Sequence, residues 1–258
     1  MPHKTVVNLN EPLIPGWYGK IPSLGDFVSR RLPADFIVLW DNWLQQAIAS
    51  SQTKLGDNWV EHYLVSPIWR FILMPEICRD SMWIGILMPS IDKIGRHFPL
   101  TFAIEVDPQP ATLFTALSAQ SWYLSLEQLA LNTLNLTVTP DDIDQALLDH
   151  AFPSMRRMDK DYSVINFADW WKSSSLNEPE DYHTSILSDP NLLLKQFELT
   201  AENIFFKKGQ EKSIWWNVSE QTTDQQIMTK LHCFVGLPKV DLFTNKASFP
   251  SKIEPVGQ

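Results

Sequence analysis

The chain has 258 residues, of which 44% are hydrophobic and 20% charged, and this composition excludes a disordered chain, a collagen-like repeat and a small disulfide scaffold. The 21 basic and 30 acidic residues leave a formal net charge of −9, so neither nucleic acid nor an anionic membrane surface is an expected partner. No apolar segment reaches the roughly 18 residues that span a membrane, and no signal-peptide pattern opens the chain. The two cysteines are far apart in sequence, as is typical of a reducing compartment, so we expect a cytoplasmic protein.

The first predicted elements are a strand, a glycine-bearing loop and two helices. Three of the nine glycines fall within residues 16–25, which predicts a strand that leads into a loop of special backbone geometry. Pro33 can occupy a helix start, and apolar residues then recur every three or four positions from Phe36 to Ala47. Asp57 is expected to cap a second helix that stops before Pro67.

Three short apolar runs follow, at residues 68–74, 82–88 and 98–106, and their Pro, Gly or charged borders predict strands. The connection between the last two is tight enough for an antiparallel pair. A long helical pattern runs from Pro110 to Leu134, and Thr139, followed by proline and two acids, predicts the start of a further helix.

The second half of the chain shows weaker patterns. Residues 172–190 are rich in serine and charge and contain two prolines, which predicts a long surface loop. Strands are expected at residues 204–206, 213–218 and 231–237.

The order of these elements predicts an α/β fold, in which helices flank a mainly antiparallel or mixed sheet. We expect an N-terminal α/β domain over residues 1–138 and a C-terminal α/β region over residues 139–258, which either packs on the first sheet or continues it.

Motifs for catalysis and cofactor binding are missing from the sequence. It has no GxGxxG or GxxxxGK[ST] loop, no GxSxG elbow and no HExxH pair, so we assign no catalytic, cofactor-binding or metal-binding residue. The best metal-like cluster consists of Asp142, Asp144, Asp149 and His150 on a predicted helix. A solvated helix whose charges complement its dipole explains the same residues more simply.

Three pairs of adjacent residues raise further questions. His232 cannot easily activate the thiol of Cys233, because neighbouring strand residues point to opposite faces. The adjacent tryptophans at 170–171 and 215–216 cannot both face one core, so in each pair one ring is either exposed or fills a second layer. Helices on both faces of the sheet would bury both rings.

Two glycine-bearing loops are the candidate partner-binding sites, because binding residues often lie on loops that a rigid scaffold holds. Asp92 and Arg96 flank a glycine at a spacing that lets the carboxylate hold the turn or pair with the guanidinium. Turn architecture alone would explain the same residue types. The candidate residues are Gly19, Lys20, Pro22, Gly25, Asp26, Phe27, Asp92, Gly95 and Arg96.

The same segments resemble the type VI secretion-associated protein TagF family, with four segments in the right order over about the first 105 residues. They are Gly16-Trp17-Tyr18-Gly19-Lys20-Ile21-Pro22 through Gly25-Asp26-Phe27-Val28, then Trp40-Asp41-x-Trp43-Leu44, then Ser66-Pro67-x-Trp69-Arg70-Phe71, and then Met88-Pro89-Ser90-x-Asp92 through Gly95-Arg96-His97-Phe98-Pro99-Leu100. Residues 213–216 and 236–238 resemble the second half of the family more weakly. His97 replaces the tyrosine of many relatives.

The resemblance implies a cytoplasmic accessory protein of a bacterial contact-dependent secretion machine, with a three-layer α/β/α fold in its N-terminal region. Members of the family act as post-translational repressors by binding a forkhead-associated scaffold protein. The family has no agreed catalytic residues to carry over to this sequence.

The leading hypothesis is therefore a non-enzymatic repressor of type VI secretion. One alternative is a structural or assembly component of the apparatus, and another is a metal-dependent hydrolase that uses Asp142, Asp149 and His150. The oligomeric state stays open.

Overall fold

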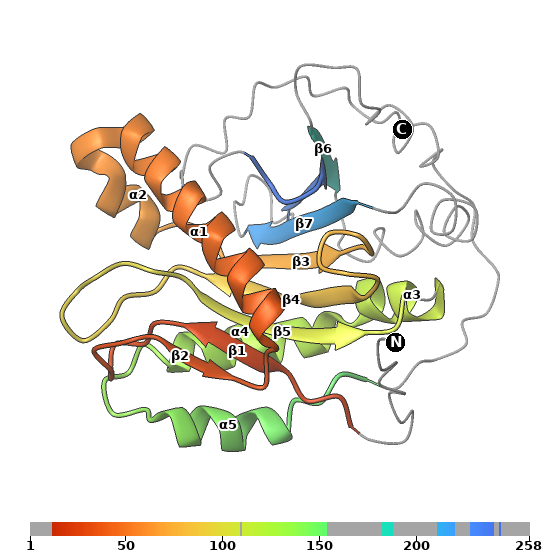
Figure 1. The fold of residues 1–258 in the computed structure, drawn as a ribbon, viewed down its shortest axis with the longest axis horizontal. Coiled ribbons are helices and arrows are strands. Elements are labelled where there is room, and N and C mark those ends of the chain that lie inside the picture. The colour runs from red at the N-terminus through yellow and green to blue at the C-terminus, as the bar shows by residue number, and fades with distance from the viewer. Residues whose placement is uncertain are drawn as a thin grey trace.

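The computed structural model describes residues 12–108, 110–153, 182–187, 211–219, 228–239 and 243. Within them the chain forms one eight-stranded sheet in the order β2-β1-β5-β4-β3-β7-β8-β6 (Figure 1). The strands are β1 (Gly16–Gly19), β2 (Val28–Arg30), β3 (Trp69–Leu73), β4 (Met82–Met88), β5 (Leu100–Val106), β6 (Tyr182–Leu187), β7 (Lys212–Ser219) and β8 (Met228–Val235). The helices are α1 (Ala34–Leu55), α2 (Trp59–Leu64), α3 (Pro110–Ser118), α4 (Gln120–Asn132) and α5 (Pro140–Leu148), with a 3-10 turn at Gly56–Asn58.

This architecture confirms the α/β class. Each strand pair of the described sheet is antiparallel. The tight connection after β4 joins it to β5 as expected, with Met82 opposite Val106 and Met88 opposite Leu100. Strands β7, β8 and β6 extend the sheet beyond β3. The division of the chain after residue 138 stays a prediction.

The first helix is longer than its apolar stripe suggested. It runs for 22 residues, from Ala34 to Leu55, between the cap residues Pro33 and Gly56, and it buries Phe36, Trp40 and Leu44 among others. The expected cap at Asp57 is wrong, because this residue lies inside the 3-10 turn and Asn58 precedes α2.

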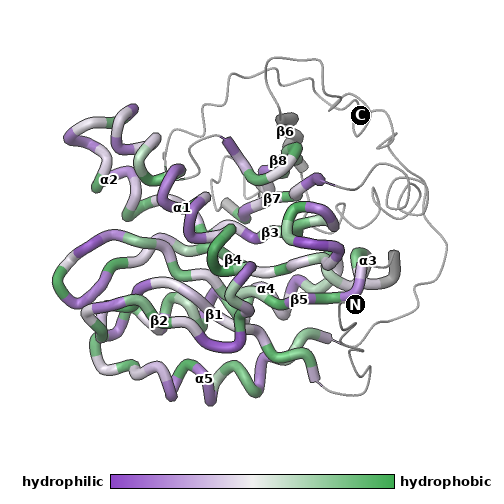
Figure 2. The backbone as a smooth tube through the Cα atoms, viewed as in Figure 1, coloured by the Kyte–Doolittle hydropathy of each residue, from purple (hydrophilic) through white to green (hydrophobic). Residues whose placement is uncertain are grey.

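The long helical pattern after Pro110 is interrupted. The structure has two helices there, α3 and α4, separated at Ala119, whose backbone leaves the helical region (φ −77°, ψ 46°). The predicted start at Thr139 is confirmed, because its hydroxyl accepts from the backbone N–H of Asp142 and the Asp142 carboxylate accepts from the Thr139 backbone N–H. Along α5 the tube in Figure 2 changes repeatedly between hydrophilic and hydrophobic colours, as expected of a helix that buries Ile143 and Leu147.

The sheet carries a separate hydrophobic cluster on each face. One cluster joins Tyr18, Phe71 and Trp215 to the aromatic residues of α1 and α2. The other joins Trp17 and Trp216 to the apolar residues of α3, α4 and α5. Alternation along β7 therefore buries both members of the 215–216 pair, one in each cluster. The 170–171 pair lies outside the described residues.

The remaining expectations for the second half differ in outcome. The proposed surface loop at 172–190 is wrong for residues 182–187, which form β6 and pair with β8. The strands at 213–218 and 231–237 are confirmed as β7 and β8 with shifted ends, whereas residues 204–206 lie outside the described part. Among the helices that the structure describes, none is long and apolar enough to cross a membrane.

Candidate functional site

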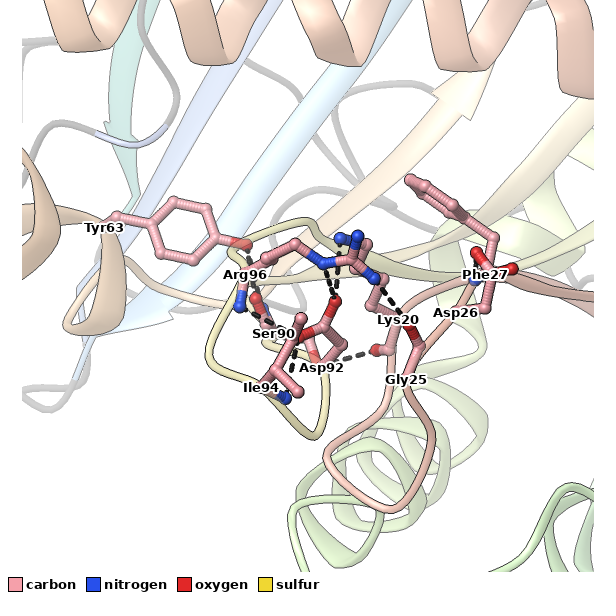
Figure 3. Close-up of polar contacts among 9 residues, drawn as sticks. All are labelled: Lys20, Gly25, Asp26, Phe27, Tyr63, Ser90, Asp92, Ile94 and Arg96. Atoms are coloured by element: carbon pink, nitrogen blue, oxygen red, sulfur yellow. Dashed lines mark hydrogen bonds and ion pairs between the residues drawn. The ribbon is translucent and has the colours of Figure 1, made fainter.

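The structure brings the two glycine-bearing loops together at one end of the sheet. The loop after β1 (residues 19–27) and the turn between β4 and β5 (residues 91–97) lie side by side (Figure 3), and we call them the turn platform. The backbone N–H of Lys93 donates to the carbonyl of Leu24 at 2.8 Å, and the guanidinium of Arg96 donates to the carbonyl of Gly25 at 2.5 Å. Segments about 70 residues apart in sequence therefore form one surface.

Two glycines are required by the backbone of the turn platform. Gly19 has φ 141°, and a Cβ there would lie 2.1 Å from the carbonyl oxygen of Pro99. Gly95 has φ 83°, in the left-handed region that favours glycine. These two positions allow β1 to end against β5 and the second loop to turn tightly.

Asp92 is the centre of the turn platform, with 1% of its surface exposed. One carboxylate oxygen accepts from the backbone N–H groups of Ile94, at 3.0 Å, and Arg96, at 2.9 Å. The other oxygen lies 3.0 Å from the Lys20 ammonium and 2.6 Å from Nε of Arg96. Burial alone would raise the pKa of Asp92, but the Arg96 backbone, Lys20, the Arg96 guanidinium and the Ile94 N–H outweigh it and hold that pKa well below its usual range.

Lys20 and Ser90 join the turn platform to the rest of the fold. The hydroxyl of Ser90 donates to the Lys20 carbonyl at 2.8 Å, and the Tyr63 hydroxyl of α2 both donates to the Ser90 carbonyl and accepts from its N–H. The buried Lys20 ammonium also lies 4.9 Å from the ring centre of Phe27. The ammonium thus has both an anion and an aromatic face beside it.

The outer surface of the turn platform combines apolar and charged side chains. Ile94 is 71% exposed and Phe27 is 42% exposed. The Phe27 ring stacks on Tyr18 at 5.7 Å and meets the edge of Phe98 at 4.7 Å, so its orientation is set by packing. The Arg96 side chain is about half exposed although two of its nitrogens are bonded. Packing and hydrogen bonds therefore order Phe27 and Arg96 in the free chain, which lowers the entropy cost of any contact made through them.

The sequence singled out nine residues of this site, and the structure places all of them in the turn platform. Pro22 is buried, and the exposed Asp26 uses its carboxylate to accept from the N–H of Phe27 at 2.8 Å. Both roles that the sequence left open for Asp92 are present, since it holds its own turn and also pairs with Arg96. Sequence reasoning missed the support from Tyr63 and Ser90, which no local spacing signals.

The metal-like cluster has other bonds in the structure. Asp142 caps its own helix, and the N–H and hydroxyl of Thr139 lower the pKa of its carboxyl. Asp144 accepts from the Trp17 indole at 2.8 Å and pairs with Arg31 at 2.8 Å. Nδ1 of His150 lies 2.6 Å from the Ala146 carbonyl. In the described part of the chain no three His, Cys, Asp or Glu side chains are grouped so that they could hold a metal ion.

The other reactive side chains are buried. Burial lowers the pKa of His232 to about 3 and raises the pKa of Cys233 to about 12 and that of Cys78 to about 11. His232 packs against Trp69, whereas Cys233 belongs to the core cluster on the other face of the sheet.

His97 has identifiable neighbours that the sequence did not reveal. Its ring meets the rings of Trp59 at 5.2 Å and Tyr63 at 5.3 Å edge to face, and burial lowers its pKa. The imidazole therefore belongs to the packing between α2 and the turn platform.

Two comparisons with known proteins found similar proteins. A family model described as "TagF N-terminal domain, Type VI secretion system-associated" matches residues 16–149, which include the whole turn platform. The chain is also similar to the crystal structure of PA0076 from Pseudomonas aeruginosa PAO1, with a TM-score of 0.60 and 27% identity. That match covers 89% of this chain and 91% of PA0076. No curated protein matches the chain.

Proposed function

Since the chain belongs to the TagF family of type VI secretion system-associated proteins, we propose that it is a non-enzymatic repressor that restrains such a system after translation. Its partner in this proposal is a forkhead-associated scaffold protein, which the resemblance of the sequence implies. The repressor acts by occupying that scaffold, and it is expected in the cytoplasm.

The turn platform is the proposed binding surface. The observation that carries this assignment is the Asp92 network, which fixes two distant loops and leaves Phe27, Ile94 and Arg96 facing outward. Aromatic and arginine side chains are common anchors of protein interfaces. Loops on a rigid scaffold are common binding sites.

The proposed mechanism is mass action and involves no covalent step. A stable inhibitory complex buries roughly 1,200–2,000 Å² in total, so residues around the turn platform must also contribute to the interface. Repression should then be complete only when the protein equals or exceeds the scaffold in concentration. The three-layer α/β/α arrangement is part of the same proposal, supported by a hydrophobic cluster on each face of the sheet.

The direct test measures binding between the purified chain and the scaffold protein by isothermal titration calorimetry. Phe27→Ala and Arg96→Glu should each weaken binding at least tenfold, since they remove an anchor and reverse a charge. Val38→Asp is the matched control, because Val38 is exposed on α1 and is not part of the turn platform. Circular dichroism must show that each variant is folded. Unchanged affinity in both platform variants would contradict the assignment of the surface.

The repressor role has a separate test in the cell. Deletion of the gene should raise secretion under repressing conditions, and the restored gene should lower it again. If deletion abolishes secretion, the protein is instead a structural or assembly component. If a small fraction of one equivalent suffices for repression in a reconstituted mixture, the mass-action mechanism is wrong.

A further inference from the structure

One long segment of the chain is almost free of charge. Between Asp107 and Asp141 the 33 intervening residues contain a single charged side chain, Glu127, where the chain average of 20% would give about seven. That carboxylate forms two hydrogen bonds with the buried guanidinium of Arg70, at 2.5 and 2.9 Å. The segment covers α3, α4 and the connection to α5, so one helical region of an acidic protein has almost no charge at its surface.

The outer face of α4 carries two exposed leucines and no charged residue. Leu124 is 57% exposed and Leu131 is 47% exposed, and their spacing of seven residues places them on the same stripe of the helix. Gln128 lies between them and is exposed. The other exposed residues of α4 are Ser121 and Asn132, and the connection to α5 adds the exposed Leu134 and Leu136. Depletion of charge around exposed leucines is typical of the centre of a protein interface.

We propose that this α4 face binds the same face of a second copy of the chain. The distribution of charge indicates why the partner is a second copy of the chain. Two copies with a formal charge of −9 each repel one another, so they can associate closely only through a face that brings no like charges together. The α4 face meets that condition with itself, because its exposed residues are uncharged and two copies can bring them together without repulsion.

The positions of the two leucines fit a twofold axis. In a symmetric dimer, residue i of one copy contacts residue j of the other and the reverse. If two α4 helices pack antiparallel with the axis beside Gln128, Leu124 of each copy meets Leu131 of the other, and the two Gln128 side chains meet at the axis. A 13-residue helix is about 20 Å long, and Leu134 and Leu136 extend the contact toward the roughly 800 Å² that each partner of a stable interface buries.

The first test is cross-linking at the axis in the full chain. Gln128→Cys should form a disulfide between copies under mild oxidation, seen as a dimer band without reductant, because residues at a twofold axis approach their own copies. Gln46→Cys is the matched control, since Gln46 is also an exposed glutamine but lies on α1, on the other face of the sheet. The native Cys78 and Cys233 are both buried and should not interfere.

The second test is sedimentation velocity across a concentration series. The native chain should approach twice the mass of one chain, and Leu124→Asp or Leu131→Asp should weaken self-association at least tenfold, since each places like charges at the interface. Val38→Asp should leave it unchanged. Circular dichroism checks that the variants are folded, and both leucines are exposed enough for the substitution to spare the core.

Several outcomes overturn the proposal. It fails if the native chain is a monomer up to about 100 µM, or if Gln46→Cys cross-links as well as Gln128→Cys. It also fails if Leu124→Asp weakens binding to the scaffold protein and leaves self-association unchanged, because the face then serves a different partner. A monomeric Leu124→Asp that still binds the scaffold supports the dimer and leaves the turn platform as the separate binding surface.

Discussion

Asp92 holds its charge in a place almost without solvent because four donors surround its two oxygens. Removing one partner of a buried ion pair leaves the other charge unpaired, which typically costs about 3–5 kcal/mol. We predict that Asp92→Asn lowers the free energy of unfolding by about 3 kcal/mol, because the buried Lys20 ammonium loses its counter-charge. Urea unfolding at pH 7 measures this.

The control for that substitution is Asp26→Asn, in the other loop of the turn platform. Its carboxylate is exposed, so the change should stay within about 0.5 kcal/mol. Lys20→Met combined with Asp92→Asn should recover part of the loss, since no unpaired charge then remains buried. An Asp92→Asn protein as stable as the Asp26→Asn protein would contradict the central role of this carboxylate.

The same carboxylate should contribute to the acid sensitivity of the fold. The pKa of Asp92 is lower in the folded protein than the ordinary 3.8, so the folded state binds the proton less readily than the unfolded chain does. The ionised carboxylate therefore stabilises the folded state fully above about pH 5. This stabilisation is lost as the pH falls through 3.8 toward the pKa that Asp92 has in the folded protein. The free energy of unfolding should therefore drop less between pH 5 and pH 3 in Asp92→Asn than in Asp26→Asn.

The sequence predicted those contacts of the turn platform that join residues close together in the chain. The pairing of Asp92 with Arg96 follows from a spacing of four residues around a glycine. The pairing with Lys20 does not, because it depends on how β1 and β5 come together in the sheet. Tyr63 and Ser90 were missed for the same reason, since they meet only when α2 packs over the turn between β4 and β5.

Helix α4 is anchored to the sheet by one buried polar cluster. Arg70 of β3 bonds both carboxylate oxygens of Glu127 and also donates to the side-chain carbonyl of Gln120 at 2.6 Å. Its guanidinium lies 5.3 Å from the ring centre of Tyr123. Removing one partner of such a buried ion pair destabilises the fold strongly. Replacing both partners with apolar residues of similar size changes the free energy of unfolding much less.

We predict that Arg70→Met alone lowers the free energy of unfolding by about 3 kcal/mol, because Glu127 is left without its partner. The double variant Arg70→Met, Glu127→Leu should recover most of that loss. Thermal unfolding measures both, and a double variant as unstable as the single variant would show that the pair contributes more than a replaceable polar contact.

The helices and strands that the sequence predicted wrongly have physical explanations. Apolar periodicity continues through Ala119, and no glycine or proline marks the interruption, so the sequence predicted one helix where the structure has α3 and α4. The segment 182–187 lies among serines, charges and prolines, and only its pairing with β8 makes it a strand. By contrast, Thr139 was predictable because its cap bonds residues three positions apart.

The arrangement of the whole molecule depends on β7, which lies between β3 and β8. Hydrophobic patterns predicted each of these strands and a sheet flanked by helices. They could not predict that β7 pairs with β3, because the two strands are about 140 residues apart and pairing depends on the packing of both faces. The sequence therefore left open whether the second half continues the first sheet.

Trp215 allows a test of whether the two halves of the chain unfold cooperatively. It is fully buried and lies 5.1 Å from Phe71, 5.4 Å from Trp43 and 6.0 Å from Trp40, measured between ring centres. A side chain from the second half thus fills the core formed by α1 and β3. Trp215→Ala should lower the free energy of unfolding by about 4 kcal/mol. The native protein and this variant should each unfold in one transition, because the two halves share this core.

Urea unfolding followed by far-UV circular dichroism and by tryptophan fluorescence makes that comparison. The two signals should have the same midpoint in the native protein and a common lower midpoint in Trp215→Ala, whereas Val38→Ala, at an exposed position of α1, should shift neither. Two separate transitions would instead support the division into residues 1–138 and 139–258 as independently folding domains. The shared aromatic core favours the single transition, since neither part can bury Trp40 or Phe71 completely without Trp215.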